Sequence, residues 1–162
     1  MNNLLKKAKN IKLLATDIDG VWTDSSMYVT LEGDFMKVFS TYDGMAVSML
    51  KKKGVIVAIL TSENTDIVLT RAEKLKITEV YIDEHEKLKR LIYLTKKYEI
   101  SMDEVAYIGD DVNDLEALKA VGLSALSGNS PIQDLFTPDY ITKRHGGSGA
   151  FREFADLILN SQ

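Results

Sequence analysis

The sequence predicts an α/β protein with a doubly wound, mostly parallel sheet, folded as one domain over residues 1–162. Three observations lead to this prediction. Short apolar runs alternate along the chain with stretches of helical period, which is typical of repeated strand–helix–strand units. The length of 162 residues suits a single domain with its own hydrophobic core. Acidic residues follow the apolar runs, as ligand-binding residues do at the ends of parallel strands.

Four apolar runs are predicted to be buried strands, because each is short and almost free of polar residues. They are Ile11 to Ala15, Val55 to Leu60, Val105 to Ile108 and Gly122 to Leu126. Three helices are predicted from apolar residues at helical spacing. They cover Asp43 to Lys53, Thr65 to Lys76 and His85 to Tyr98. Gly54 should end the first helix, and Ser101 to Glu104 has the spacing of a capping box, which we interpret as a tight turn.

A β-hairpin is predicted directly after the first strand, where the alternation of strand and helix is broken. Met27 to Thr30 and Phe35 to Ser40 flank the turn sequence Leu31-Glu32-Gly33-Asp34. A lone two-stranded ribbon is only marginally stable in water, and the apolar residues of this one have no obvious cover within the chain. The hairpin 27–40 is therefore a candidate interface between subunits.

The composition excludes several classes of protein. Twenty Lys and Arg against 24 Asp and Glu give a net charge of −4, without the excess of basic residues that nucleic-acid binding requires. The absence of cysteine excludes disulfides and cysteine nucleophiles. No apolar run approaches the ~20 residues that span a bilayer, and the first residues are basic without an apolar h-region, so we expect an unprocessed protein. We expect a cytoplasmic protein without a nucleic-acid or membrane partner.

Polar residues suited to phosphate chemistry follow the predicted strands. They are Asp17-Ile18-Asp19-Gly20, Thr61-Ser62 and Gly109-Asp110-Asp111-Val112-Asn113-Asp114, with Lys87 just inside the third helix. The carboxyl ends of parallel strands meet at one edge of a sheet, so these residues should converge on one crevice. Carboxylates gathered there repel one another unless a hard cation such as Mg²⁺ neutralises them. The pattern predicts a magnesium-dependent phosphoryl-transfer site.

These motifs resemble the complete set of the haloacid dehalogenase (HAD) superfamily of phosphatases. The resemblance rests on Asp17-x-Asp19-Gly20 with Thr23-Asp24, Thr61, Lys87 and Gly109-Asp110-Asp111-x-x-Asp114. It implies a Rossmann-like sheet, Mg²⁺ as cofactor and hydrolysis of a phosphoric monoester. The resemblance makes Asp17 the nucleophile that forms an aspartyl-phosphate, and Asp19 the general acid and base. Thr61 and Lys87 would hold the oxygens of the transferred phosphoryl group.

The resemblance also implies the metal ligands. Mg²⁺ would be bound by the carboxylate of Asp17, the backbone carbonyl of Asp19 and the carboxylate of Asp110. Asp111 and Asp114 would occupy supporting positions. A carboxylate beside a divalent cation stays ionised at neutral pH, as a nucleophile must.

No cap domain fits this sequence. The stretch from Gly20 to Thr61 is filled by the hairpin and one helix, and the stretch from Thr61 to Asp110 by two helices and a short strand. A capless site is open to water, so a large substrate or a neighbouring subunit has to cover it. The chain resembles the capless, tetrameric branch that acts on phosphorylated 2-keto-3-deoxy sugar acids. That resemblance implies a homotetramer assembled through the hairpin 27–40.

The choice of substrate within this branch depends on fewer residues. Octulosonate 8-phosphate phosphatases typically read Thr-Gly-Arg at the second motif, where this chain reads Thr61-Ser62-Glu63. Arg71 and Lys74 lie three residues apart on one helix face and suit a carboxylate. With Glu63 they resemble the phosphatases of nine-carbon acids such as KDN and sialic acid 9-phosphates. The substrate-binding candidates are Asp43, Gly44, Ser62, Glu63, Arg71 and Lys74.

We therefore expect a nine-carbon 9-phosphate as the substrate, with 3-deoxy-D-manno-octulosonate (KDO) 8-phosphate as the alternative. Three other functions are less favoured. A receiver-type signalling domain carries its phospho-acceptor after the middle strand and has no counterpart of Asp19. A non-catalytic HAD assembly module does not need the complete set of catalytic residues, and a phosphomutase needs the missing cap.

Overall fold

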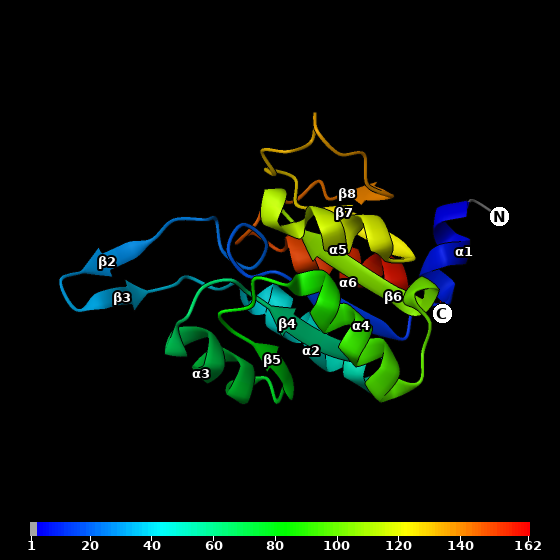
Figure 1. Cartoon of the computed structure of the whole chain (residues 1–162), viewed down its shortest axis with the longest axis horizontal. Helices are drawn as coiled ribbons and strands as arrows, with labels where there is room; N and C mark the ends of the chain where they lie inside the picture. Colours follow the sequence, from blue (N-terminus) through cyan, green and yellow to red (C-terminus); the bar gives the residue numbers. More distant parts are fainter. Residues whose placement is uncertain (1–2) are drawn as a thin grey trace.

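The structure is a computed structural model in which residues 3–162 are described. A six-stranded parallel sheet lies between two layers of helices, and a two-stranded antiparallel hairpin projects from the body (Figure 1). The strand order is β5-β4-β1-β6-β7-β8. In that order the strands are Glu79–Tyr81, Ile56–Leu60, Leu13–Thr16, Val105–Gly109, Leu123–Leu126 and Tyr140–Ile141. The predicted α/β class with a doubly wound sheet is confirmed.

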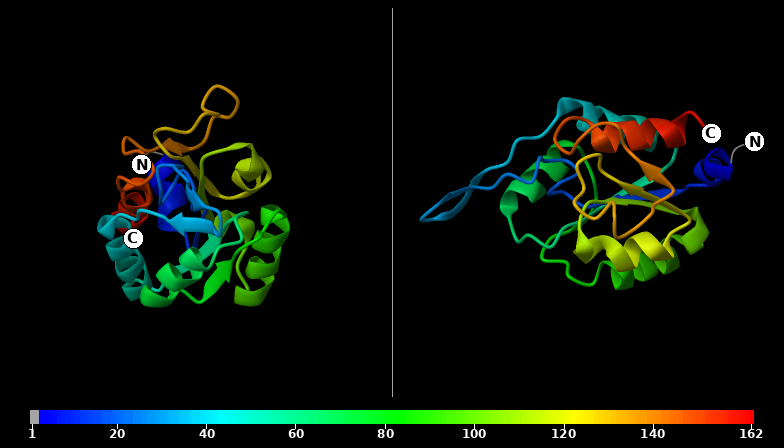
Figure 2. Two further views of the ribbon diagram at one scale, coloured as in Figure 1. Left: turned by 90° about the vertical axis from the view of Figure 1, so that its left-hand side faces the viewer. Right: turned by 90° about the horizontal axis from the view of Figure 1, so that it is seen from above.

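Six α-helices cover the sheet. They are α1 (Asn3–Lys9), α2 (Thr41–Lys52), α3 (Asp66–Lys74), α4 (Lys87–Tyr98), α5 (Leu115–Ala120) and α6 (Ala150–Leu159). Figure 2 shows α2 and α6 along one face and α4 and α5 along the other. Two 3₁₀ turns, η1 (Met102–Glu104) and η2 (Val112–Asp114), precede β6 and α5. No helix within residues 3–162 is long and apolar enough to cross a membrane.

Side chains of the central strands alternate between the two helical layers, because successive residues of a strand face opposite sides. In β1, Leu14 packs in the core beneath α2 and α6, whereas Leu13 and Ala15 pack beneath α4 and α5. All three are completely buried. Burial on both faces explains why the strands are nearly continuous apolar runs in the sequence.

Local signals in the sequence set most element ends. The side chains of Ser40 and Thr65 accept hydrogen bonds from backbone N–H groups in the first turns of α2 and α3. Gly54, with φ of +78°, follows the C-cap of α2 as predicted. Ser101 and Glu104 form both hydrogen bonds of a capping box, but the box encloses only the short turn η1. Helix α4 begins at Lys87, two residues later than predicted.

The hairpin consists of β2 (Tyr28–Thr30) and β3 (Gly33–Met36) and extends away from the sheet in Figure 1 and in the right view of Figure 2. The predicted turn covered four residues, but only Leu31 and Glu32 lie between the two strands, because Gly33 already pairs with Thr30. Every residue of both strands is exposed. The prediction of a ribbon without cover inside the chain is therefore confirmed for these residues.

The strand order places the loops that follow β1, β4 and β6 next to one another. The chain runs from β1 to β4 and β5 on one side, and then returns to β6 on the other side of β1. This reversal creates a crevice at the carboxyl ends of β1 and β6, which is where ligands bind in open α/β sheets. Between β1 and β4 the chain forms only the hairpin and α2, so no cap domain is inserted there.

We predict that Phe151→Ala strongly destabilises the fold, because Phe151 is fully buried in α6 and its ring centroid lies 4.7 Å from that of Trp22. Removing a buried aromatic ring typically lowers the free energy of unfolding by about 3–5 kcal/mol. Leu135→Ala, at an exposed position, is the control and should change it by less than about 0.5 kcal/mol. Urea unfolding followed by circular dichroism measures both variants, and equal losses would contradict this assignment of the core.

Candidate active site

The loop after β1 is a tight structure held by backbone hydrogen bonds. The carbonyl of Ile18 accepts hydrogen bonds from the N–H groups of Val21, Trp22 and Thr23 at 3.1, 2.8 and 3.2 Å. Gly20 has φ of +88°, and a Cβ atom there would lie 1.8 Å from Asp110 Oδ2. Glycine is therefore required at this position, both for the backbone conformation and for the close approach of the Asp110 carboxylate.

Three carboxylates and one ammonium group meet at the carboxyl ends of β1 and β6. Oxygens of Asp17, Asp110 and Asp114 all lie within 4.8 Å of one another. Lys87 Nζ lies 3.0 Å from Asp17 Oδ1 and 2.6 Å from Asp114 Oδ1. The side chains of Asp17, Lys87 and Asp114 are almost completely buried. The structure thus brings together residues that are up to 97 positions apart in the sequence.

Asp114 is fully engaged by the protein itself. Its Oδ1 accepts hydrogen bonds from Lys87 Nζ and from the hydroxyl of Tyr107, both at 2.6 Å. Its Oδ2 accepts hydrogen bonds from the backbone N–H groups of Asp110 and Asp111 at 2.9 and 3.3 Å. Both oxygens of Asp114 are therefore occupied. These hydrogen bonds fix Lys87 and the loop that carries Asp110.

Asp110 is the opposite case. Among residues 3–162, no hydrogen bond or ion pair to its carboxylate is found, although the residue is only 7% exposed. Its backbone is held on both sides, since its N–H binds Asp114 and its carbonyl accepts a hydrogen bond from Ser130 Oγ at 2.5 Å. A rigidly placed carboxylate without a protein partner is well suited to bind a metal ion.

Burial and mutual repulsion make these carboxylates difficult to ionise without a cation. Burial, with the added charges of Asp17 and Asp114, raises the pKa of Asp110 to about 8. Burial and the charge of Asp114 raise the pKa of Asp17 to about 7, against the opposing effect of Lys87. Burial alone would lower the pKa of Lys87, but the charges of Asp17 and Asp114 outweigh it and raise that pKa. The cluster therefore has a deficit of positive charge that a divalent cation would fill.

The carboxylates open into a small crevice of about 170 Å³. Its lining residues come from the loops after β1, β4 and β6: Asp17, Asp19, Ser25, Thr61, Ser62, Glu63, Asp110, Asp111 and Asn113. Asn113 Nδ2 donates to Ser62 Oγ at 3.2 Å, which joins the loops after β4 and β6. Thr61 is buried at the end of β4. The crevice presents carboxylates and hydroxyls to a ligand the size of a phosphoryl group, and the buried ammonium of Lys87 lies 3.0 Å from Asp17 without lining the crevice.

Similarity to known proteins places this site in a family. The family model described as haloacid dehalogenase-like hydrolase matches residues 28–122, more than half of the chain. The curated KDO 8-phosphate phosphatase of Haemophilus influenzae is 36% identical over 97% of this chain and 87% of its own length. The chain belongs to the haloacid dehalogenase-like hydrolases.

Two solved structures of relatives share the fold. That of the KDO 8-phosphate phosphatase from Moraxella catarrhalis, in complex with magnesium, phosphate and KDO, has a TM-score of 0.95 and 40% identity, covering all of this chain and 93% of that one. The cobalt-bound form of the Haemophilus influenzae phosphatase has a TM-score of 0.92 and 36% identity, covering 96% of this chain and 91% of that one. This HAD-like hydrolase is a phosphoric monoester hydrolase that uses Mg²⁺.

The predicted substrate-binding residues are divided between the crevice and the layer behind it. Ser62 and Glu63 line the crevice. Asp43 is completely buried and accepts a hydrogen bond from the backbone N–H of Arg152 at 2.8 Å, so it caps the start of α6. Burial raises the pKa of Asp43 to about 6. Lys74 is exposed at the end of α3.

Arg71 contacts other residues of the chain and does not line the crevice. Its Nη2 donates to the carbonyl of Ser40 at 3.3 Å, and its guanidinium lies 5.6 Å from the ring centroid of Phe39. A Cβ atom on Gly44 would lie 2.8 Å from Arg71 Nη2, so Gly44 leaves room for this packing. Neither Arg71 nor Gly44 lines the crevice.

Several residues of the site were not found from the sequence. The hydroxyl of Tyr107 donates a hydrogen bond to Asp114. Ser25 and Asn113 line the crevice, and Lys37 forms an ion pair with Asp19. Tyr107 lies in an otherwise apolar buried strand, so the sequence suggests a packing role for its ring and gives no sign of the hydrogen bond that its hydroxyl makes. Lys37 lies at the end of an exposed ribbon, where a lysine is normally a solvated surface group. Only the tertiary structure shows that these two side chains turn toward the site.

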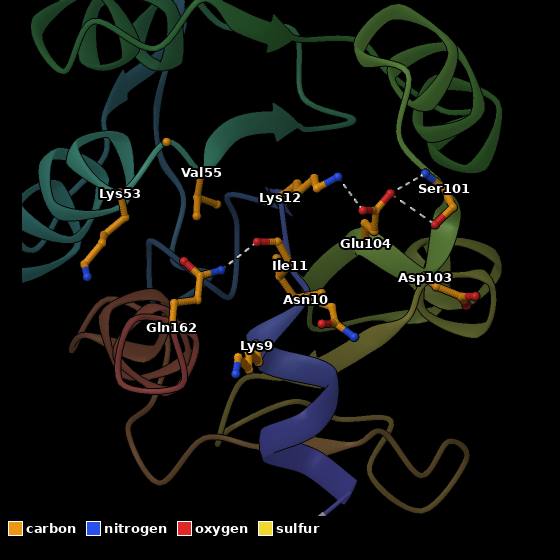
Figure 3. A pocket seen from close by; sticks show the side chains of 11 residues that line it. Lys9, Asn10, Ile11, Lys12, Lys53, Val55, Ser101, Asp103, Glu104 and Gln162 are labelled. Atoms are coloured by element: carbon orange, nitrogen blue, oxygen red, sulfur yellow. Dashed lines mark hydrogen bonds and ion pairs between the residues drawn. The ribbon is translucent and has the colours of Figure 1, made fainter.

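A larger hollow, of about 590 Å³, lies at the other ends of the strands from the crevice (Figure 3). It is lined by residues that precede β1, β4 and β6, so it faces the amino ends of the strands. Two of its polar side chains have partners within the hollow. Lys12 pairs with Glu104 at 2.6 Å, and Gln162 Nε2 donates to the backbone carbonyl of Ile11 at 2.7 Å. Ligands bind at the carboxyl ends of the strands in open α/β sheets, so the small crevice is the candidate active site.

We predict that Mg²⁺ raises the melting temperature more at pH 8 than at pH 6. In the metal-free protein, the free energy of unfolding should fall as the pH rises from about 4 toward 8, because the pKa values of Asp17 and Asp110 lie above those in the unfolded chain. Mg²⁺ compensates the ionised carboxylates and so offsets this loss. Differential scanning fluorimetry at both pH values measures the effect.

Asp110→Asn should remove most of this magnesium-dependent rise, because it deletes the carboxylate that has no protein partner. Asp103→Asn, an exposed acidic position at the other edge of the sheet, should behave like the wild type. A rise of the same size at both pH values, or in Asp110→Asn, would contradict the assigned metal site.

Proposed function

We propose that this chain hydrolyses a phosphorylated 2-keto-3-deoxy sugar acid, with KDO 8-phosphate as its preferred substrate. The observation that carries the proposal is the crevice lined by Asp17 and Asp110, whose carboxylate oxygens lie within 4.8 Å of each other, with the buried Nζ of Lys87 3.0 Å from Asp17. The substrate is supported by relatives: the curated ones that match 97–99% of the chain are KDO 8-phosphate phosphatases. These relatives favour the eight-carbon alternative over the nine-carbon acid expected from the sequence.

The nine-carbon acid is the second candidate, and one residue still favours it. Glu63 lines the crevice, where the eight-carbon enzymes typically have an arginine. The other two residues behind that expectation do not line the crevice, because Arg71 packs against Ser40 and Lys74 is exposed. Within one chain, only Glu63 of the three residues is placed where it could contact the substrate.

The first half of the proposed reaction transfers the phosphoryl group to Asp17. A carboxylate oxygen of Asp17 attacks phosphorus in line with the leaving group, a new O–P bond forms, and the bond from phosphorus to the sugar oxygen breaks. The electron pair of the broken bond goes to the sugar oxygen, which takes a proton from Asp19. Lys87, 3.0 Å from Asp17, balances the charge that gathers there.

The second half releases phosphate. Asp19, now ionised, removes a proton from a water molecule that attacks the aspartyl-phosphate, and the bond between phosphorus and Asp17 breaks. Thr61 offers its hydroxyl to the phosphoryl oxygens from the end of β4. The carboxylates of Asp17 and Asp110 and the carbonyl of Asp19 would hold Mg²⁺, with Asp111 nearby. When bound, the ion neutralises phosphoryl oxygens and allows two anions to meet.

We predict that a phosphate-release assay with Mg²⁺ shows the highest kcat/KM for KDO 8-phosphate among eight- and nine-carbon keto-deoxy acid phosphates. Asp17→Asn should lower turnover of every substrate by at least about 10³-fold, because an amide cannot form the acyl-phosphate. Asp103→Asn is the matched control and should retain activity. Near-wild-type phosphate release by Asp17→Asn would exclude the mechanism, whereas a higher kcat/KM for a nine-carbon 9-phosphate would exclude only the substrate.

The proposed partner is the chain itself: four copies would assemble through the hairpin 27–40 into a homotetramer. Large apolar side chains are exposed along it: Met27, Tyr28, Val29, Leu31, Phe35, Met36 and Val38. So many exposed large apolar side chains on one two-stranded ribbon are unusual on a monomer. The crevice of about 170 Å³ is also smaller than the roughly 300–1,000 Å³ of typical small-molecule sites, so a sugar acid needs cover from outside the crevice.

We predict that replacing Val29 and Leu31 together with Lys reduces the assembly to smaller species, because the charged side chains cannot be buried against another hairpin. Light scattering coupled to size exclusion measures the mass. The control replaces Ile92 and Leu135, two exposed apolar residues outside the hairpin, with Lys and should leave the mass unchanged. A wild-type protein that is monomeric at micromolar concentration would refute the proposed assembly.

A further inference from the structure

A lysine at the base of the hairpin contacts the carboxylate of Asp19. Lys37 directly follows β3, and its Nζ lies 2.6 Å from Asp19 Oδ1. The Lys37 side chain is 2% exposed, whereas Met36 and Val38 on either side of it are 41% and 56% exposed. A single buried ammonium in an otherwise exposed segment is held by its ionic partner and not by general apolar packing.

The contact uses one oxygen of Asp19 and leaves the other one free. Oδ1 also accepts a hydrogen bond from Thr23 Oγ1 at 3.2 Å. Thr23 is itself fixed, because its hydroxyl oxygen accepts the N–H groups of Gly20 and Ser25 at 3.4 and 3.2 Å. Oδ2 of Asp19 is buried and has no hydrogen-bond partner among residues 3–162. Lys37 and Thr23 therefore hold one oxygen from two sides.

We propose that Lys37 is a positioning residue for the acid and base of the reaction. By holding Oδ1, it leaves Oδ2 as the oxygen that gives a proton to the leaving sugar oxygen and later takes one from water. The inference rests on the proposed function, since it requires Asp19 to act as that acid and base. An aspartate free to rotate about its side-chain torsions would spend part of its time with neither oxygen aligned.

The same contact joins the hairpin to the catalytic loop. Asp19 and Lys37 are 18 positions apart, and both strands of the hairpin lie between them. The returning strand thus carries the group that orients Asp19. One ion pair thus links the base of the hairpin to the carboxylate of Asp19.

The test separates the protonation of the leaving group from the rest of the reaction. Enzyme in excess over substrate is mixed with KDO 8-phosphate or p-nitrophenyl phosphate, and release of the sugar acid or of p-nitrophenol is followed over one turnover. p-Nitrophenolate leaves without a proton, so its release does not need an oriented acid. Lys37→Met should slow release of the sugar acid about 10–100-fold and that of p-nitrophenol less than about 3-fold.

Controls separate positioning from a general loss of structure. Lys97→Met breaks another lysine–carboxylate ion pair, that with Glu79 at 2.5 Å, whose residues do not line the crevice, and should leave both rates unchanged. The chain has no cysteine, so a Lys37→Cys variant can be alkylated uniquely with 2-bromoethylamine, which restores an ammonium group at nearly the same reach. Alkylation in denaturant followed by refolding should restore release of the sugar acid, with wild-type protein treated in the same way as a reference.

The outcomes are distinct. Equal loss of both rates in a folded Lys37→Met variant, no loss, or no recovery on alkylation would overturn the role of Lys37. Asp19→Asn serves as the reference for the proposed function and should show a larger loss with the same dependence on the leaving group. If Asp19→Asn shows no such dependence, the acid role of Asp19 is wrong. If it does and Lys37→Met does not, only the positioning role is wrong.

Discussion

Three carboxylates buried around one ammonium group are the constraint on which the active site depends. Asp17, Asp110 and Asp114 have oxygens within 4.8 Å of one another, and Lys87 is the cation between Asp17 and Asp114. Such a cluster is unfavourable unless every charge has a partner. The protein satisfies Asp114 with four hydrogen bonds, pairs Asp17 with Lys87 and leaves the carboxylate of Asp110 without a partner within residues 3–162. Burial and the neighbouring carboxylates raise the pKa of Asp110, and a bound Mg²⁺ would compensate the same negative charge.

The rest of the domain stabilises this unfavourable cluster through a buried apolar sheet and hydrogen-bonded loops. Central strands with apolar side chains on both faces anchor the loops that carry Asp17, Thr61 and Asp110. Backbone groups then fix those loops, as the carbonyl of Ile18 does for the first one. Residues that resemble substrate contacts in the sequence serve the scaffold in part: Asp43 caps α6, and Arg71 packs beside Gly44. The site is thus rigid around the phosphoryl group and sparse around the remainder of the substrate.

The hairpin connects the catalytic chemistry with the outer surface of the molecule. It exposes apolar side chains on both strands, yet delivers the buried Lys37 to Asp19 where it rejoins the body. A small capless crevice requires cover for the substrate, and an apolar ribbon requires cover for itself. The proposed assembly of chains through the hairpin would meet both requirements. In that assembly, the ion pair between Lys37 and Asp19 would link the interface between chains directly to Asp19.

The sequence by itself determined four of the six strands and the set of motif residues at their carboxyl ends, because these depend on periodicity and on residues next to strand ends. It also indicated the exposed hairpin, but it did not locate β5 or predict β8. Only the tertiary structure showed that the carboxylate of Asp110 has no partner within residues 3–162, whereas that of Asp114 accepts four hydrogen bonds, although both residues follow the same strand. The same holds for Lys37. In the sequence it resembles an ordinary surface lysine, but in the folded chain its ammonium contacts Asp19, which lies 18 positions earlier. Side-chain pairing over such separations depends on packing in three dimensions, and no local pattern encodes it.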